Sequence, residues 1–459
     1  MNTDTSPPAR LPADPLPRHL DLLHRRWTDA LGHHHFDCAV IAAGQSRPYF
    51  LDDQAPPFRA NPHFQQWFPS DACEGSLLLI RPGQRPRLFF LKPDDYWHQP
   101  PELPEWAHAH FEISEHADAA DVEQAALASA AGAGRHCAWI SEQPVANQHS
   151  GQLNPQGLLD ELHYLRACKS DFEIGCMREA TRSAVLGHEA ARALFESGRL
   201  VSEFELNLAY LAGAATTAGE LPYASIVALN QHAGVLHYQH YDRQPPATAR
   251  SFLIDAGARC NGYASDITRT YAAHLPPAPE IFHDLLKAMN AAQLDLIATI
   301  RPGLSFLELH IDMHRRLATI LTDSGILRCS ATSAFESGLT ESFFPHGLGH
   351  LIGLQTHDVG GQQKNPAGDR QPPPENYPSL RLTRTLTPGT VVTIEPGLYF
   401  IPKLLDALKA GPQRNAVNWP ALESLRPCGG IRIEDNVLIT EKGTDNLTRT
   451  AFQQVQAQQ

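Results

Sequence analysis

Short apolar runs separated by proline-rich stretches dominate the first third of the chain. Four of these runs, FDCAVIAA, EGSLLLI, RLFFLK and HCAWIS, have the length and the β-prone composition of strands. Helical text and breaks such as QAPPFRANP lie between them. This mixture predicts a compact α/β unit. The first ~16 residues are proline-rich and polar, and we expect them to be disordered.

The pattern changes near residue 168, where a long helical stretch begins. Ser170-Asp171-Phe172-Glu173 has the form of a capping box, and Gly198 stands where a glycine would end the helix. Beyond it, strand-like runs alternate with helical text, and the proline-rich segment 361–378 has the composition of a loop. The expected strands cover 225–229, 251–255, 391–395 and 431–438, and the expected helices lie near 280–300 and 305–322. We therefore divide the chain into an N-terminal domain, 1–168, and a C-terminal domain, 169–459.

Composition excludes several classes of protein. The 459 residues are 42% hydrophobic, enough for sizeable cores, yet no run approaches the ~18 to 20 apolar residues of a membrane span. The N-terminus has no apolar signal region. A net charge of −13 without a basic run argues against nucleic-acid and membrane partners. The 8 cysteines form no CxxC pair, so neither a disulfide framework nor a zinc–thiolate site is expected. We expect a soluble, cytoplasmic protein.

The passage FLIDAGARCNGYASDITRTY contains the first candidate site residues. Asn261-Gly262 between two apolar runs is typical of a two-residue β-hairpin turn. With this turn, Asp255 and Asp266 lie on one face of the hairpin as diagonal neighbours, roughly 6 to 8 Å apart at the backbone. Two carboxylates at this separation can hold cations between them, whereas without a cation one of them would be driven to protonate. A solvated hairpin with two unrelated acids is the alternative at this point.

Three further segments favour the metal interpretation. HGLGHLIGLQTH, residues 346–357, places three histidines in a glycine-rich stretch where backbone can approach a ligand closely. Glu395 closes the apolar run VVTIE, and Pro396-Gly397 turns the chain at once. In IRIED, Arg432 and Glu434 share the face opposite the isoleucines, and inward charges are costly unless they are paired or metal-bound. Alone, such a histidine would be structural and such a glutamate a rim charge, but together these residues predict a carboxylate-rich site.

Four strings carry a resemblance to a known family: FLIDAG…NGYASDITRTY, PHGLGHLIGLQTHDVGG, VVTIEPGLYFIP and GGIRIEDNV. They resemble the pita-bread metallopeptidases, and they are most similar to the bacterial Xaa-Pro dipeptidase (prolidase) branch and to its relative, organophosphorus acid anhydrolase. The similarity extends through YFLDDQAPPFRANPHFQQWFP and PDDYWH, so it covers nearly the whole chain. It implies an α+β homodimer, with a C-terminal pita-bread domain and a smaller creatinase-like α/β N-terminal domain.

The resemblance also implies a set of metal ligands, and this chain carries each of them. In this reading Asp266 and Glu434 bridge two ions, and Asp255 chelates one of them. His350, the second histidine of HGLGH, and Glu395 hold the other ion, and Glu395 also shuttles the proton. His346 matches no ligand position. The implied metal ligands are Asp255, Asp266, His350, Glu395 and Glu434.

Substrate-handling positions follow from the same match. His237 and His357 are implied to position the scissile carbonyl and the developing charge, and Arg381 to act on the substrate as well. Tyr223 falls on a pocket residue. Asp53 corresponds to an acid that reaches the partner subunit's site.

The chemistry of this ligand set is that of a dinuclear hydrolase. Four carboxylates and one imidazole make a hard, oxygen-rich site suited to Mn²⁺, with Co²⁺ or Zn²⁺ as alternatives. Two divalent ions balance four carboxylates, so that a bridging hydroxide can attack the peptide carbonyl. We therefore expect a dipeptidase that hydrolyses Xaa-Pro dipeptides. A side activity on organophosphorus esters is also expected, because phosphoryl and acyl transition states both place negative charge on an oxygen beside the metal.

Three alternatives are weighed against this prediction. An enzyme of the aminopeptidase P type would accept longer peptides, and the N-terminal similarity argues against it. A non-catalytic pita-bread binding protein and a metal-free creatinase-type hydrolase would both lack metal ligands, and the complete ligand set argues against these two.

Overall fold

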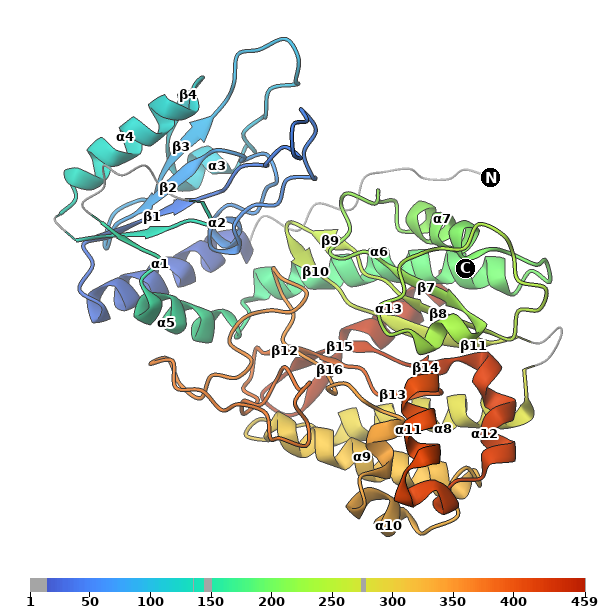
Figure 1. The fold of residues 1–459 in the computed structure, drawn as a ribbon. Coiled ribbons are helices and arrows are strands. Elements are labelled where there is room, and N and C mark those ends of the chain that lie inside the picture. Colours follow the sequence, from blue (N-terminus) through green and yellow to red (C-terminus); the bar gives the residue numbers. More distant parts are fainter. Residues whose placement is uncertain (1–14, 135, 144–150, 274–277, 459) are drawn as a thin grey trace. The chain divides into compact units, whose positions relative to one another are not determined.

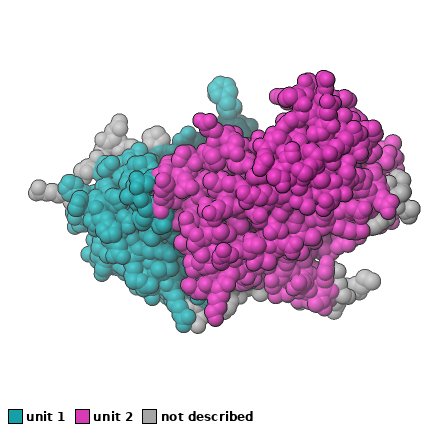
Figure 2. Space-filling model, turned by 90° about the horizontal axis from the view of Figure 1, so that it is seen from below, with its two compact units in different colours: residues 1–176, 260–263, 365–369 teal, residues 177–259, 264–364, 370–459 magenta. Residues whose placement is uncertain are grey.

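The computed structural model describes residues 15–134, 136–143, 151–273 and 278–458 (Figure 1). The chain forms two compact units, which Figure 2 colours separately. Unit 1 comprises residues 1–176, 260–263 and 365–369, and unit 2 comprises 177–259, 264–364 and 370–459. The domain boundary between residues 168 and 169 stays a prediction. The disorder expected for the first ~16 residues falls, up to residue 14, outside the described residues, and Pro15 already begins a helix.

A six-stranded sheet forms the centre of unit 1, in the order β4-β3-β2-β1-β5-β6. The apolar runs predict four of its strands correctly: β1 (Cys38–Ala42), β2 (Leu77–Ile80), β3 (Arg87–Leu91) and β5 (Cys137–Ile140). The pattern does not predict β4 (Glu112–His116) or β6 (Gln152–Leu153), which form the two edges of the sheet. β4 reads EISEH and buries none of its residues fully, so its apolar signal is weak.

The helices of unit 1 lie on both sides of this sheet (Figure 1). Val122 and Ala126 of α4 pack onto Val40 and Phe89 of the strands. On the other side α1 buries Trp27 and its neighbours and packs against α5. The helices are α1 (Pro15–His33), α2 (Pro62–Trp67), α3 (Ala107–His110), α4 (Ala119–Ala131) and α5 (Gln156–Arg166).

The predicted long helix is α6 (Asp171–Phe195). Its capping box forms as expected, because the Ser170 N–H donates to the Glu173 carboxylate at 2.7 Å and the Glu173 N–H donates to Ser170 Oγ at 3.3 Å. Past its end, Gly198 has a φ of +79°, the left-handed conformation that a helix-ending glycine adopts without strain.

Unit 2 is built on several small antiparallel sheets. β8 (Ser251–Asp255) lies between β7 (Ile226–Leu229) and β11 (Thr268–Ala272), and β15 (Asp435–Ile439) lies between β12 (Val391–Ile394) and β16 (Thr444–Asn446). β13 (Gly397–Tyr399) pairs with β14 (Gly430–Arg432). In the hairpin between β8 and β11, whose tip at residues 260–263 is counted with unit 1, β9 (Arg259–Cys260) pairs with β10 (Tyr263–Ala264). The run 431–438, predicted as one strand, is two strands. Glu395 and Pro396 separate β12, which pairs with β15, from β13, which pairs with β14. The partner strand is therefore interrupted at the same level, between β14 and β15.

Helices surround these sheets in unit 2 (Figure 1). α8 and α9 confirm the two helices predicted from the pattern, and they pack against each other. Residues 361–378, all of them described, form no helix or strand, as predicted. The helices are α7 (Glu203–Gly213), α8 (Glu280–Thr299), α9 (Phe306–Asp323), α10 (Ala331–Glu336), α11 (Pro402–Ala410), α12 (Trp419–Leu425) and α13 (Leu447–Gln456), with 3₁₀ turns η1 (Asn230–Gly234), η2 (Leu339–Ser342), η3 (Pro412–Ala416) and η4 (Arg426–Cys428).

Two expectations from composition can be compared with the structure. No disulfide joins any of the eight cysteines, which all lie in the described residues, and five of them are buried. Within the described part of the chain, no helix combines the length and the apolar character that crossing a bilayer requires.

Candidate metal centre

The hairpin around Asn261-Gly262 has the predicted register. Both turn residues have positive φ, +50° and +87°, as a type I′ turn requires. Thr268 lies opposite Asp255 in the ladder of β8 and β11. Asp255 and Asp266 therefore share one face, and the hydroxyl of Tyr223 donates to both carboxylates, at 2.8 Å for Asp255 Oδ1. The two acids meet as the sequence predicts.

The HGLGH segment runs directly alongside β12. The His350 N–H donates to Thr393 Oγ1 at 3.0 Å, the Thr393 N–H to the His350 carbonyl at 2.9 Å, and the Glu395 N–H to the Leu348 carbonyl at 2.8 Å. A Cβ at Gly349 would lie 2.0 Å from the Thr393 carbonyl oxygen, so only glycine permits this approach. The close pairing brings the His350 ring next to the Glu395 carboxylate.

A cluster of potential ligands forms where these segments meet. Asp266, His350 and Glu434 each offer one ligand atom, and these atoms lie within 4.8 Å of one another. His350 Nε2 lies 3.5 Å from Asp266 and 3.7 Å from Glu395. The Nδ1 of the same ring lies 3.0 Å from the Leu351 carbonyl and donates its proton there, so Nε2 is the ring atom that faces the carboxylates. A neutral ring in this tautomer can offer its Nε2 lone pair to a metal.

The electrostatics of the cluster favour added positive charge. Burial raises the pKa of Glu395 to about 7, with His350 opposing and Asp266 adding to the shift. Burial and repulsion by Asp266 and Glu395 raise the pKa of Glu434 well above its ordinary value, and burial raises that of Asp255. Burial acts in the same direction on Asp266, but the hydrogen bond to His350 brings its net pKa down. Buried carboxylates this close cannot all ionise without a cation, so the donor set fits divalent metal.

The stability of the metal-free protein should fall as pH rises. An unfolded glutamate has a pKa near 4.5, whereas the folded pKa of Glu395 is about 7, so the folded state holds the proton more tightly. The resulting stabilisation is complete below pH ~4.5 and is lost as pH rises through about 7. The test is the thermal unfolding of the native protein and of Glu395→Gln, both with chelator, from pH 5 to 8. As pH rises, the Tm of the native protein should fall relative to that of the variant. A difference that does not change with pH would contradict the shift.

Arg432 connects the cluster to a second row of side chains. Its Nη2 donates to Asp255 Oδ2 at 2.7 Å, and its Nη1 donates to the Tyr399 hydroxyl at 2.9 Å. The Tyr399 hydroxyl in turn donates to His346 Nε2 at 2.8 Å. Burial lowers the pKa of His346 to about 3, so this ring is a neutral acceptor. The alternation in IRIED predicts that Arg432 points inward, whereas nothing in the pattern marks Tyr399 as its partner.

Thr268 is a site residue that the sequence analysis missed. Its Oγ1 donates to Glu434 Oε2 at 2.7 Å and its carbonyl accepts from the Glu434 N–H at 3.0 Å. Its position opposite Asp255 in the hairpin was the one signal that could have identified it.

Of the remaining predicted site residues, some lie near the carboxylate cluster in unit 2, and Asp53 belongs to unit 1. The ring of His357 lies 4.5 Å from that of His350 and perpendicular to it. Burial, and then the charges of His350 and Arg381, lower the pKa of His357 to about 4, and His237 adds to the effect. His237 and Arg381 are exposed and lie within electrostatic reach of His357. Asp53 is exposed on a loop of unit 1, where it accepts a bond from the Gln54 side chain at 3.2 Å.

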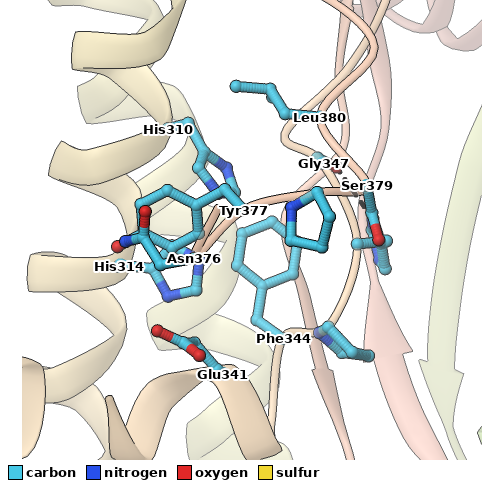
Figure 3. Close-up of a pocket in the computed structure, with 12 residues that line it drawn as sticks. His310, His314, Glu341, Phe344, Gly347, Asn376, Tyr377, Ser379 and Leu380 are labelled. Atoms are coloured by element: carbon cyan, nitrogen blue, oxygen red, sulfur yellow. Dashed lines mark hydrogen bonds between the residues drawn. The ribbon is translucent and has the colours of Figure 1, made fainter. Parts of the chain in front are cut away.

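A cavity of about 170 Å³ borders the HGLGH segment (Figure 3). His310 and His314 project into this region from α9, and Tyr377 packs against both rings. Phe344 stacks on His314 with the ring centroids 5.0 Å apart. Burial lowers the pKa of His310 to about 3 and of His314 to about 4, so both rings are neutral. The cavity is lined by His310, His314, Glu341, Phe344, Pro345, His346, Gly347, Asn376, Tyr377, Pro378, Ser379 and Leu380.

Unit 2 by itself holds the complete set of implied ligands. Asp255, Asp266, His350, Glu395 and Glu434 all belong to it. They come from the hairpin, from the HGLGH segment beside β12, from the end of β12, and from the break between β14 and β15.

Comparison with known proteins supports the fold and the metal chemistry. The family model for metallopeptidase family M24 matches residues 175–441, and the model for the Xaa-Pro dipeptidase N-terminal domain matches residues 15–164. The chain is 44% identical over 435 residues to an Xaa-Pro dipeptidase from Stenotrophomonas maltophilia, covering 95% of this chain and 96% of that one. It is 43% identical over 438 residues to an Xaa-Pro dipeptidase from Pectobacterium atrosepticum, covering 94% and 97%.

Solved structures with low sequence identity share the fold. Aminopeptidase P from E. coli, solved with the inhibitor Pro-Leu, gives a TM-score of 0.72 at 21% identity and covers 98% of both chains. Proline aminopeptidase P II from Yersinia pestis gives 0.69 at 22% identity and covers 93% of this chain and 96% of that one. The predicted α+β class and its two-domain pita-bread architecture are confirmed. The chain therefore belongs to metallopeptidase family M24, carries an N-terminal domain of the Xaa-Pro dipeptidase type, and is a metal-dependent peptidase.

Proposed function

We propose that the protein is a dinuclear-metal dipeptidase that hydrolyses Xaa-Pro dipeptides. The observation that carries the proposal is a buried group of carboxylates around His350 Nε2, in a chain 44% identical over 95% of its length to a protein named Xaa-Pro dipeptidase. Asp266 and Glu434 would be shared between two ions, with Asp255 on one ion. His350 and Glu395 would hold the other.

The metals and the protein residues contribute different parts of the reaction. A pair of divalent ions, when bound, lowers the pKa of water and stabilises negative charge on oxygen. Glu395 is the proposed proton shuttle, because a carboxylate beside the attacking water can take up its proton and pass it on. His357, whose pKa is about 4, is neutral and can donate an N–H to the developing oxyanion. His237 would orient the scissile carbonyl, and Tyr223 lines the pocket where it contacts both aspartates.

The proposed ions are Mn²⁺, because carboxylate oxygens outnumber the single imidazole among the ligands. Co²⁺ and Zn²⁺ are the next candidates. The direct test is metal analysis of the purified protein together with a glycyl-proline assay. Chelation should remove activity and added Mn²⁺ should restore it. Full activity in the chelated protein would overturn the metal mechanism.

Arg381 is expected to read the length of the substrate. A dipeptidase must distinguish a free C-terminal carboxylate from a continuing chain, and an arginine fork binds carboxylate bidentately. Arg381 is exposed and lies within electrostatic reach of His357. Arg381→Ala should lower kcat/KM for glycyl-proline by a factor that corresponds to roughly 1.5 to 3 kcal/mol of lost transition-state stabilisation. It should barely change the already poor rate with glycyl-proline amide.

The control for this prediction lies three residues further along the chain. Arg384 is 3% exposed and donates to the Gly360 carbonyl at 3.4 Å, so Arg384→Ala removes an arginine that supports the loop. That variant should affect the acid and the amide in equal proportion. Equal proportional losses in Arg381→Ala would show that it, too, supports structure. Efficient cleavage of tripeptides by the native protein would favour an enzyme of the aminopeptidase P type.

We also propose that the protein acts as a homodimer in the cytoplasm. Phe50 and Leu51 are 90% and 91% exposed, and Tyr96 and Trp97 are 86% and 75% exposed. Apolar side chains this exposed favour a protein partner, and a second copy is the proposed one. Asp53 lies in the same loop as Phe50 and would reach the partner's site. The eight free cysteines suit a reducing compartment. Light scattering of the purified protein measures the oligomeric state.

A side activity on organophosphorus esters belongs to the same proposal. Phosphoryl and acyl transfer both place negative charge on an oxygen beside the metals, so the same residues would stabilise both reactions. Hydrolysis of an organophosphorus ester should therefore be lost together with dipeptidase activity on chelation.

A further inference from the structure

Glu203, the first residue of α7, is a buried carboxylate with four hydrogen-bond donors. It is 1% exposed. Its Oε1 accepts from the Leu229 N–H at 2.8 Å and from His232 Nδ1 at 2.7 Å. Its Oε2 accepts from the Tyr238 hydroxyl at 2.6 Å and from the Asp242 N–H at 2.9 Å. Each oxygen therefore has two donors, which is the full accepting capacity of a carboxylate.

This saturation excludes the simplest alternative for the group. Glu203, His232 and Asp242 lie close enough together to resemble a metal site. A metal ion would have to displace protein donors from Glu203, two of which are the backbone N–H groups of Leu229 and Asp242. Burial of a carboxylate is costly unless hydrogen bonds compensate it, and here they do. Glu203 is therefore an anchor for the protein's own backbone.

The anchored segment, residues 229–242, carries His237. The donors at Leu229 and His232 precede His237, and those at Tyr238 and Asp242 follow it. The His232 and Tyr238 rings stack at a centroid distance of 4.5 Å and an angle of 23°. Tyr238 is buried, whereas His237, its neighbour, is exposed. The chain is thus held by Glu203 on both sides of the exposed His237.

A second contact closes the base of the same excursion. The Asn230 side chain donates to the Thr248 carbonyl at 2.6 Å and accepts from the Arg250 N–H at 2.7 Å. The connection between β7 and β8, residues 230–250, is therefore fixed at its base by Asn230 and in its middle by Glu203. His237 itself has electrostatic contact with His346 and His357, at the metal centre.

We infer that Glu203 is a positioning residue, which fixes the segment 229–242 so that His237 meets the substrate beside the metal centre. The inference rests on the proposed function, because the substrate role of His237 is part of that proposal. It extends that function to a residue that does not touch the reacting atoms.

The test is a double-mutant cycle on kcat/KM for glycyl-proline with Mn²⁺-loaded protein. Glu203→Gln keeps the size of the side chain but turns an amide NH₂ toward N–H and O–H donors. It should lower kcat/KM by about 10- to 100-fold while leaving the bound metal unchanged. In the His237→Ala background the same substitution should cost less than about 2-fold, because the residue through which it acts is gone.

Two further variants separate positioning from general stability. Glu205→Gln changes the capping-box glutamate two residues away on α7, which contacts Ser202 and not the 229–242 segment. It should lower stability slightly and leave kcat/KM unchanged. Tyr238→Phe keeps the Glu203 carboxylate and removes one donor beside His237. It should give a smaller loss with the same non-additivity, and it serves if Glu203→Gln does not fold.

Amide exchange gives a readout that does not depend on activity. Exchange in residues 229–242 should rise in Glu203→Gln and not in Glu205→Gln. Unchanged exchange, or an equal loss of kcat/KM with and without His237, would overturn the positioning role. Native activity in His237→Ala would overturn it as well, together with the assignment of His237. If the native protein does not hydrolyse glycyl-proline but exchange is altered in Glu203→Gln, the proposed function is wrong, while Glu203 still fixes the segment 229–242.

Discussion

Replacing Asp266 by asparagine, or Glu434 by glutamine, is expected to abolish turnover of glycyl-proline while leaving the fold largely intact. Both carboxylates lie with His350 in one group whose ligand atoms are within 4.8 Å of one another. Each substitution removes one of the two charges proposed to be shared by both ions, so it weakens the binding of each ion. The fold survives because the change is isosteric and removes repulsion among buried carboxylates.

Metal content and thermal unfolding check this prediction together. Both variants should bind fewer than two ions. In the presence of chelator, Glu434→Gln should unfold no earlier than the native protein, whereas Asp266→Asn loses the hydrogen bond to His350 and should unfold slightly earlier in one cooperative transition. Glu441→Gln, at an exposed position shortly after β15, is the matched control and should behave as the native protein does. Full Mn²⁺-dependent activity in either variant would remove that residue from the site.

Replacing His357 by alanine should lower turnover by ~10²- to 10³-fold with little loss of metal. The ring of His357 contacts that of His350. His357 does not belong to the group of Asp266, His350 and Glu434, whose potential ligand atoms lie close together. With a pKa of about 4 it is neutral at the pH of the assay, and its N–H is available to an oxyanion. A donor used only in the transition state lowers kcat and kcat/KM by the same factor.

His350→Ala is the comparison for this second prediction. That variant removes the Nε2 proposed as a ligand, so metal content should fall together with activity. If His357→Ala also loses metal, His357 is a ligand and the role of His350 has to be reassigned. If it raises KM and leaves kcat unchanged, His357 binds the ground state and the transition state equally.

The parts of the fold that the sequence predicts correctly are those determined over short distances along the chain. The Asn261-Gly262 turn determines the register of its own hairpin, and therefore the shared face of Asp255 and Asp266. The capping box of α6 lies within four residues. The glycines of HGLGH predict that backbone can approach a ligand closely, and that prediction stays untested. The close approach that the structure shows at Gly349 is to the backbone next to it, at Thr393 of β12.

The parts that the sequence could not predict depend on partners far along the chain. The break between β14 and β15 follows from a break in the opposite strand, about 40 residues earlier, and the run 431–438 does not show it. Glu203 reads as an ordinary acidic residue at a helix start, and its burial depends on donors 26 to 39 residues away. The edge strand β4 has too little apolar character to be recognised alone.

The hairpin of Asp255 and Asp266 has a consequence for how the length of this chain can vary. Successive side chains of a strand point to opposite faces, so one residue inserted or deleted between 256 and 265 would turn Asp266 away from Asp255. The segment 361–378 has no such register to keep, because it forms no helix or strand. Length differences among related proteins should therefore gather in 361–378 and be absent from the ten residues between the two aspartates. Aligned relatives of this chain would test that expectation without an assay.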